Sequence, residues 1–220
     1  MNDASLTIVP ILAIPFGILP LPELELLNPA LSALFNERMR DESAAQRSPL
    51  CYQGSDDLFE WPDELVRQLA TGIFRGLYSV VNAVNDFTET QLRALKSEAR
   101  AWFTVIEPDG GVPATNYPLT TWCAIYCVAA PEPSSTRSDS GVLRFYESRP
   151  NTMFTDASNS SMRLPFTPGH HAWRPMPGNI AIFPASLTHE VAPVRSPGRL
   201  VLVTVRVRFV GPAQQGPARW

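Results

Sequence analysis

The sequence is poor in the residues from which disulfide frameworks and most metal sites are built. It has only three cysteines and three histidines in 220 residues. A small, odd number of cysteines argues against a disulfide framework and fits a reducing compartment, so we expect a cytoplasmic protein. There is no excess of basic residues either, because the formal net charge is −3. The charge therefore gives no electrostatic footprint for binding nucleic acid.

Long hydrophobic runs are also missing. The most apolar stretch, residues 6–22, is interrupted by four prolines and has no positive charge before it. A secretory signal needs a basic start and an unbroken apolar run, and a membrane span needs about 20 apolar residues. We therefore expect no membrane association here, and we predict an edge strand followed by a proline-rich turn.

What the sequence does contain is enough apolar material for one domain over residues 1–220, since 45% of its residues are hydrophobic. Apolar spacing and capping residues predict helices over 30–40, 62–81 and 88–99, and the last of these starts with a capping-box pattern at Thr88 and Gln91. Strands are predicted over 102–106, 122–129 and 142–147. The chain thus divides into a helical elaboration, about 28–99, and a β core, about 101–210. This order indicates an α+β domain with helices packed outside a β-sandwich or barrel.

The stretch Gly178–Val210 appears to organise the core as two strands, the first delivering His189 and the second beginning at Arg199. From Arg199 the residues alternate with period two, and the odd-numbered face is apolar except for Arg199 itself. Burying an arginine is costly unless an anion meets it. We therefore interpret this face as the inside of a cavity that admits a carboxylate or phosphate. The alternative is an arginine at the strand mouth that reaches water.

Nearly the whole chain resembles the 2-oxoglutarate/Fe(II)-dependent oxygenases of the double-stranded β-helix, or jelly-roll, superfamily. The most specific part reads PGNIAIFPASLTHEV, followed by an arginine ten positions after the histidine. The resemblance implies a jelly-roll fold and Fe(II) and 2-oxoglutarate as cofactors. It makes His189 the distal iron ligand and Arg199 the residue that holds the far carboxylate of 2-oxoglutarate. It also places Tyr126 and Cys123 in the cofactor site, although a buried free cysteine is usually a small hydrophobe.

The other two iron ligands of the family, His-x-His or His-x-Asp, are missing. Aligned on the strand WCAIYCV, those positions are occupied by Thr115 and Tyr117. A facial iron site needs two imidazoles and a carboxylate, and neither a threonine hydroxyl nor a phenol with an ordinary pKa near 10 replaces them. His170, His171 and Asp109 are better explained as loop or strand-end residues.

Three hypotheses remain open from the sequence. The first is an oxygenase that acts on a small molecule, by hydroxylation or a related oxidation, with an atypical metal site around His189 and Tyr117. The second is an iron-free cyclase, isomerase or hydrolase in which His189 is the acid or base and Arg199 binds a substrate carboxylate. The third is a non-catalytic subunit of a heterodimer; a homodimer is also compatible with the sequence. Fold resemblance alone cannot choose among them.

Overall fold

Two facing β-sheets form the centre of the molecule in the computed structural model, which describes residues 13–41, 47–48, 50–133, 137–146, 161–162, 165–166 and 169–210. The larger sheet has the order β1 (Gly17–Pro20), β9 (Asn179–Pro184), β6 (Trp122–Ala129), β11 (Leu200–Val210), β4 (Lys96–Ile106), β3 (Cys51–Gln53), β2 (Arg47–Ser48). The smaller sheet has the order β5 (Val112–Thr115), β10 (His189–Val191), β7 (Leu143–Tyr146), β8 (His170–Trp173). All strand pairs in both sheets are antiparallel. The predicted α+β jelly-roll fold is confirmed.

The stretch Gly178–Val210 forms three strands, so the prediction of two was wrong. Proline cannot donate a ladder hydrogen bond, and Pro184 ends β9 in the larger sheet. A turn closed by a hydrogen bond from Leu187 N to Pro184 O (2.9 Å) then takes the chain to the smaller sheet, where β10 begins with His189. His189 therefore lies on a different sheet from the strand that precedes it. The predicted N-terminal edge strand is found as β1, while residues 6–12 lie outside the described part.

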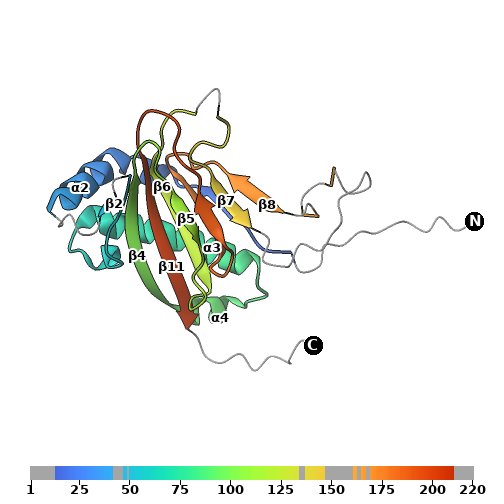
Figure 1. The fold of residues 1–220 in the computed structure, drawn as a ribbon. Coiled ribbons are helices and arrows are strands. Elements are labelled where there is room, and N and C mark those ends of the chain that lie inside the picture. Colours follow the sequence, from blue (N-terminus) through green and yellow to red (C-terminus); the bar gives the residue numbers. More distant parts are fainter. Residues whose placement is uncertain are drawn as a thin grey trace, which may run out of the picture.

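The helices cover one side of the larger sheet (Figure 1). They are α1 (Pro22–Glu25), α2 (Asn28–Asp41), α3 (Glu64–Ala83) and α4 (Glu89–Ala94), with a short 3-10 helix at Leu58–Glu60. The side chain of Asp63 caps α3 by accepting hydrogen bonds from the backbone N–H of Leu65 and Val66. Within the described residues, no helix is both long enough and apolar enough to span a membrane.

The third predicted helix is shorter than expected because a strand replaces its second half. The capping box at Thr88 and Gln91 is present, but α4 ends at Ala94. The next residues form the first half of β4, which pairs with β11 along its whole length, from Lys96 opposite Val210 to Ile106 opposite Leu200. This long-range pairing supplies hydrogen bonds that no local pattern of residues 95–101 announces.

The larger sheet is buried on both faces and so separates two cores. The helix-side core lies between this sheet and the helices and includes Leu69, Ile73, Leu77, Val105, Tyr126, Val201, Val203, Val205 and Val207. The inter-sheet core lies between the two sheets and includes Ile106, Cys123, Ile125, Cys127, Leu143, Phe145, Phe183, Val191, Leu200 and Leu202. The odd-numbered residues of β11 thus face the helices. The prediction that they face the inside of the jelly roll was wrong.

Candidate functional site

His189 begins β10 at one end of the inter-sheet core. It pairs with Thr115 of β5 on one side and with Phe145 of β7 on the other. Only 4% of its surface is exposed. Its Nδ1 lies 2.9 Å from the carbonyl oxygen of Leu187. Because a carbonyl oxygen can only accept, Nδ1 carries the hydrogen, and Nε2 keeps the lone pair.

Aromatic side chains surround the imidazole. The ring centroids of Phe183, Tyr117 and Phe145 lie 5.0, 5.7 and 6.0 Å from that of His189. Removal from water disfavours the charged form of a histidine. Burial accordingly lowers the pKa of His189, and the hydrogen bond to Leu187 opposes this only in part. His189 is therefore a neutral imidazole near pH 7, with its hydrogen fixed on Nδ1.

Thr115 and Tyr117 both lie beside His189, as the alignment of the sequence predicted. Thr115 is the residue directly opposite His189 in the β5–β10 pair, and the Tyr117 ring contacts the imidazole. A hydrogen bond from Tyr117 N to Ala185 O (2.7 Å) holds this segment against the turn before β10. Burial raises the pKa of Tyr117 and Cys123 raises it further, while the charge of Arg206 opposes both. Tyr117 is thus a neutral phenol that can donate a proton.

Cys123, which the resemblance assigned to the cofactor site, is fully buried in the inter-sheet core. It is close enough to Tyr117 to affect its pKa, so the two side chains share this end of the core. Burial raises the pKa of the Cys123 thiol itself. A thiol with a raised pKa is a poor nucleophile and a poor metal ligand, so Cys123 behaves here as a small apolar residue.

Arg199 and Tyr126 lie away from His189, on the other side of the larger sheet. The Arg199 guanidinium is paired with Glu107 (Nη2–Oε1 2.8 Å) and donates from Nη1 to Asn36 Oδ1 of α2 (3.2 Å). The hydroxyl of Tyr126 donates to Asn28 Oδ1 in the helix-side core (2.8 Å). The anion that the sequence analysis expected to face Arg199 is thus supplied by Glu107. Neither residue contacts the group formed by His189, Thr115 and Tyr117.

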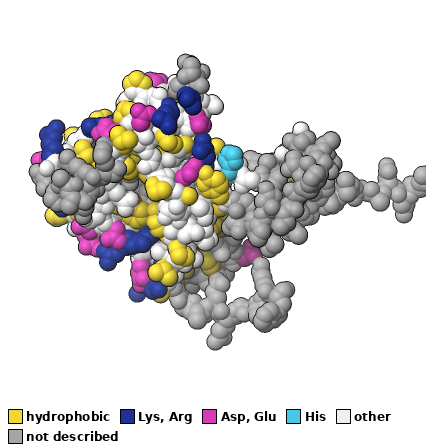
Figure 2. Space-filling model, viewed as in Figure 1, with side chains coloured by type: hydrophobic (Ala, Val, Ile, Leu, Met, Phe, Trp, Pro, Cys, Tyr) yellow, Lys and Arg dark blue, Asp and Glu magenta, His cyan; other side chains and the backbone are white. Residues whose placement is uncertain are grey.

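A different arginine, Arg206, lies on the face of β11 that does point toward His189. Its guanidinium is 5.9 Å from the Trp102 ring centroid, and the Trp102 ring is 5.4 Å from that of Tyr117. Arg206 also pairs with Asp56 (2.8 Å) and is partly exposed. Basic and acidic side chains alternate over much of this side of the molecule (Figure 2). The sequence analysis missed Arg206, although its even number already placed it on the face opposite Arg199.

The family is identified by a sequence profile described as "Putative 2OG-Fe(II) oxygenase", which matches residues 100–203. The β core of this chain belongs to that family. None of the curated proteins has a sequence that matches the chain. Solved structures of the same fold include a prolyl-4-hydroxylase from Pseudomonas putida, at 15% identity and a TM-score of 0.57, covering 90% of this chain and 94% of that one.

Two further oxygenase-family structures align over most of the chain. AviO1 from Streptomyces viridochromogenes Tue57 has a TM-score of 0.59 and 14% identity, with 94% of each chain covered. The epimerase SnoN has a TM-score of 0.59 and 10% identity, with 93% of this chain and 84% of that chain covered; its structure contains Fe³⁺ and alpha ketoglutarate. At these identities the likeness establishes the fold alone.

The residues around His189 do not fit the iron and 2-oxoglutarate of these oxygenases. The two positions that accompany the histidine carry a hydroxyl and a protonated phenol, so the site offers one imidazole and no anionic ligand. Within the described ranges, no three His, Cys, Asp or Glu side chains are grouped so that they could hold a metal. The described part of the inter-sheet core is apolar, and Arg199, the expected anchor for 2-oxoglutarate, is behind the larger sheet.

Proposed function

We propose that the chain is an iron-independent enzyme on the oxygenase fold, which transfers protons in a small molecule through His189. The observation that carries this proposal is the pairing of a neutral imidazole, whose Nε2 lone pair is available, with a neutral phenol 5.7 Å away between ring centroids. A base and an acid held side by side in a mostly buried site are the equipment of general acid–base catalysis.

The reaction class follows from what these two groups can do. Nε2 of His189 accepts a proton from a C–H or O–H bond of the bound molecule, and the hydroxyl of Tyr117 donates a proton to another of its atoms. The proton on Nε2 then replaces the one that Tyr117 gave up, so that both residues return to their starting states. Protons and electrons balance without an oxidant. The net change is an isomerisation or a redox-neutral cyclisation, or a hydrolysis where water is the second reactant.

A small acid is the substrate class that the charge distribution favours. Arg206 and Trp102 continue the line from His189 through Tyr117 toward the protein surface. A guanidinium next to an aromatic ring binds a carboxylate attached to a flat or apolar body. We therefore assign to Arg206 the anchoring role that the family resemblance gave to Arg199.

An oxygenase with an atypical metal site is the second candidate. The observation in its favour is that Thr115, Tyr117 and His189 meet at one point, as the three ligand positions of the family would. In this case the protein would need added Fe(II) and 2-oxoglutarate for turnover.

Solvent deuterium exchange separates the two candidates without knowledge of the substrate. The purified protein is incubated in D₂O with EDTA and a panel of 2-oxo acids, including 2-oxoglutarate, and the loss of the C3 hydrogens is followed by proton NMR. We expect exchange that EDTA does not inhibit, and a fall of about 10²–10⁴-fold in His189→Gln, the range over which general bases contribute. Tyr117→Phe should slow product formation while the folded state is kept, because the ring still packs on Trp102.

Three results would contradict the proposal. Exchange or turnover that appears only with added Fe(II) supports the oxygenase. Exchange that is unchanged in His189→Gln removes this residue from the chemistry. Absence of activity with every acid in the panel, together with binding to a second protein that survives His189→Gln, supports the non-catalytic subunit.

A further inference from the structure

A second cavity lies at the end of the β core opposite His189. It has a volume of about 290 Å³ and forms where β6 and β8 end and β7 and β11 begin. Apolar atoms provide most of its walls, from Pro131, Pro133, Pro175, Met176, Pro177 and Leu200. Because proline has a fixed backbone angle, walls of this kind are already formed before a ligand arrives, and little conformational entropy is lost on binding.

Two buried serines form the polar floor of this cavity. Ser140 and Ser196 are 3% and 6% exposed, and their hydroxyl oxygens lie 3.2 Å apart. Ser140 Oγ also accepts a hydrogen bond from Arg195 N (2.7 Å). Whichever serine donates to the other, one of the two hydroxyl hydrogens is left over. A buried donor of this kind favours a ligand that brings an acceptor atom.

Arg174 supplies a positive charge at the same place. Its guanidinium donates to the backbone oxygens of Ser140 (3.0 Å) and Ser138, and it has no carboxylate partner within the part of the chain that the structure describes. The two backbone bonds hold the guanidinium in position at the wall of the cavity. An arginine has five N–H donors, so donors remain for a bound anion.

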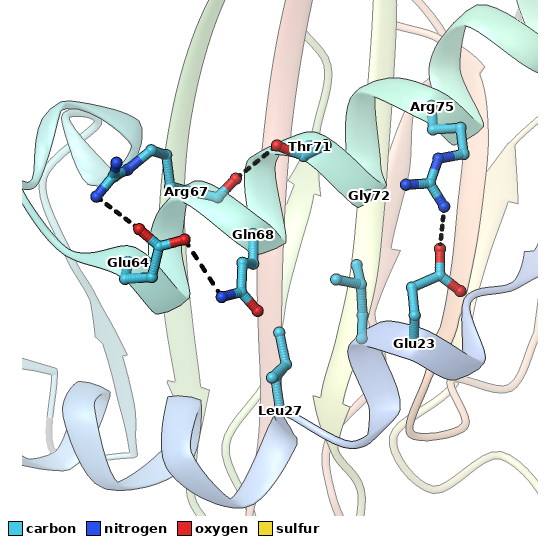
Figure 3. Close-up of a pocket in the computed structure, with 9 residues that line it drawn as sticks. Glu23, Leu27, Glu64, Arg67, Gln68, Thr71, Gly72 and Arg75 are labelled. Carbon is cyan, nitrogen blue, oxygen red and sulfur yellow. Dashed lines mark hydrogen bonds and ion pairs between the residues drawn. The ribbon is translucent and has the colours of Figure 1, made fainter.

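A cavity of the same volume between α1 and α3 shows what distinguishes the Arg174 cavity. Its charges neutralise one another, because Arg75 pairs with Glu23 (2.7 Å) and Arg67 with Glu64 (2.7 Å), as Figure 3 shows. All four side chains are largely exposed to solvent. That groove offers an anion neither a free guanidinium nor a buried donor.

We infer that the Arg174 cavity binds a small monocarboxylic acid with an apolar body. The carboxylate accepts from Arg174 and from the free serine hydroxyl, and the apolar part packs against the prolines and Leu200. Glu132 also lines the cavity, and its negative charge disfavours a dianion such as a phosphate monoester. The binding site is separate from the proposed proton-transfer site, because the length of β10 and the turn after it lie between them.

Benzoate is a suitable probe, with benzamide as its uncharged isostere and phenyl phosphate as the dianion. Binding to the full chain is measured by ¹H–¹⁵N NMR titration, which also shows where each probe binds. We expect shifts at Ser140, Ser196 and Leu200, and affinity in the order benzoate, benzamide, phenyl phosphate. Ser196→Ala and Arg174→Met should each weaken benzoate by about tenfold or more, the cost of losing a hydrogen bond to a charged group.

The controls make the result independent of folding. Ser196→Ala removes a hydroxyl without disturbing the backbone bonds of Arg174, so it tests the site even if Arg174→Met lowers the melting temperature. Arg75→Met removes an arginine from the α1–α3 groove and should leave benzoate affinity unchanged. Equal binding of benzoate and benzamide, tighter binding of phenyl phosphate, shifts at other residues or no benzoate binding at all would each overturn the inference.

Discussion

The two faces of the larger sheet are built from the same strands but differ in character along their length. The helix-side face of β11 is apolar from Val201 to Val207, and the buried Tyr126–Asn28 pair satisfies its main polar group internally. The inter-sheet face begins apolar at Leu200 and becomes polar at Thr204 and Arg206, near the end where His189 lies. Only a face with such a change can bury a core at one end and offer chemistry at the other. The helix-side face therefore contributes stability and the inter-sheet face contributes the site.

The largest effect expected from this comparison concerns stability. Ile73 is fully buried where α3 packs on the larger sheet. Ile73→Ala should lower the free energy of unfolding by about 2–5 kcal/mol, the usual cost of removing a large aliphatic side chain from a core. Urea denaturation followed by circular dichroism measures it. Arg67→Ala, on the exposed side of the same helix, is the matched control and should change stability by less than about 0.5 kcal/mol. Similar losses in both variants would mean that α3 does not cover the sheet.

Period two in β11 was correctly predicted, but the choice of the inner face was wrong, and the reason is physical. Alternation tells which residues share a face, and a strand buried on both faces gives no contrast between an inside and an outside. The deciding fact is that the apolar stripe of α3, with Leu69, Ile73 and Leu77, covers the valines. This is a contact between distant parts of the chain. A single arginine at the start of the apolar face was weaker evidence than the helix that had to be buried somewhere.

Local patterns were informative wherever local chemistry determines the structure. The capping box at Thr88 and the position of Pro184 could be read directly from the sequence, because each acts through its own backbone neighbours. The alignment that put Thr115 and Tyr117 at the ligand positions also held, since β5 brings both beside His189. The first half of β4 and the pairing of Arg199 with Glu107 depend on long-range partners, and no local pattern contains them.

A smaller effect tests the burial of His189 on the inter-sheet side. Burial lowers its pKa in the folded state, so below the ordinary value of 6.5 the unfolded chain binds a proton that the folded chain does not. The unfolded state then binds more protons, and stability falls on acidification, by at most about 1.4 kcal/mol per pH unit. Above pH 6.5 this contribution is fully present.

The measurement is the difference in unfolding free energy between the wild type and His189→Gln from pH 7.5 to pH 5. Tyr117 and Cys123 stay protonated throughout, because their pKa values are raised, so they add no slope. We expect the wild type to lose stability relative to the variant as the pH falls through this range. Parallel curves would mean that the imidazole is as accessible to protons as in the unfolded chain.

The smallest effect compares the two arginines on opposite faces of β11. Each belongs to a partly exposed ion pair, so Arg199→Gln and Arg206→Gln should each cost about 1 kcal/mol of stability or less. Their effect on the proton-exchange reaction should differ. If Arg206 holds the acid group of the substrate, Arg206→Gln raises the acid concentration needed for half-maximal exchange about tenfold, whereas Arg199→Gln leaves it unchanged. The reverse outcome would show that Arg199 reaches the inter-sheet side, and the assignment of the two faces would then be wrong for the first residue of the strand.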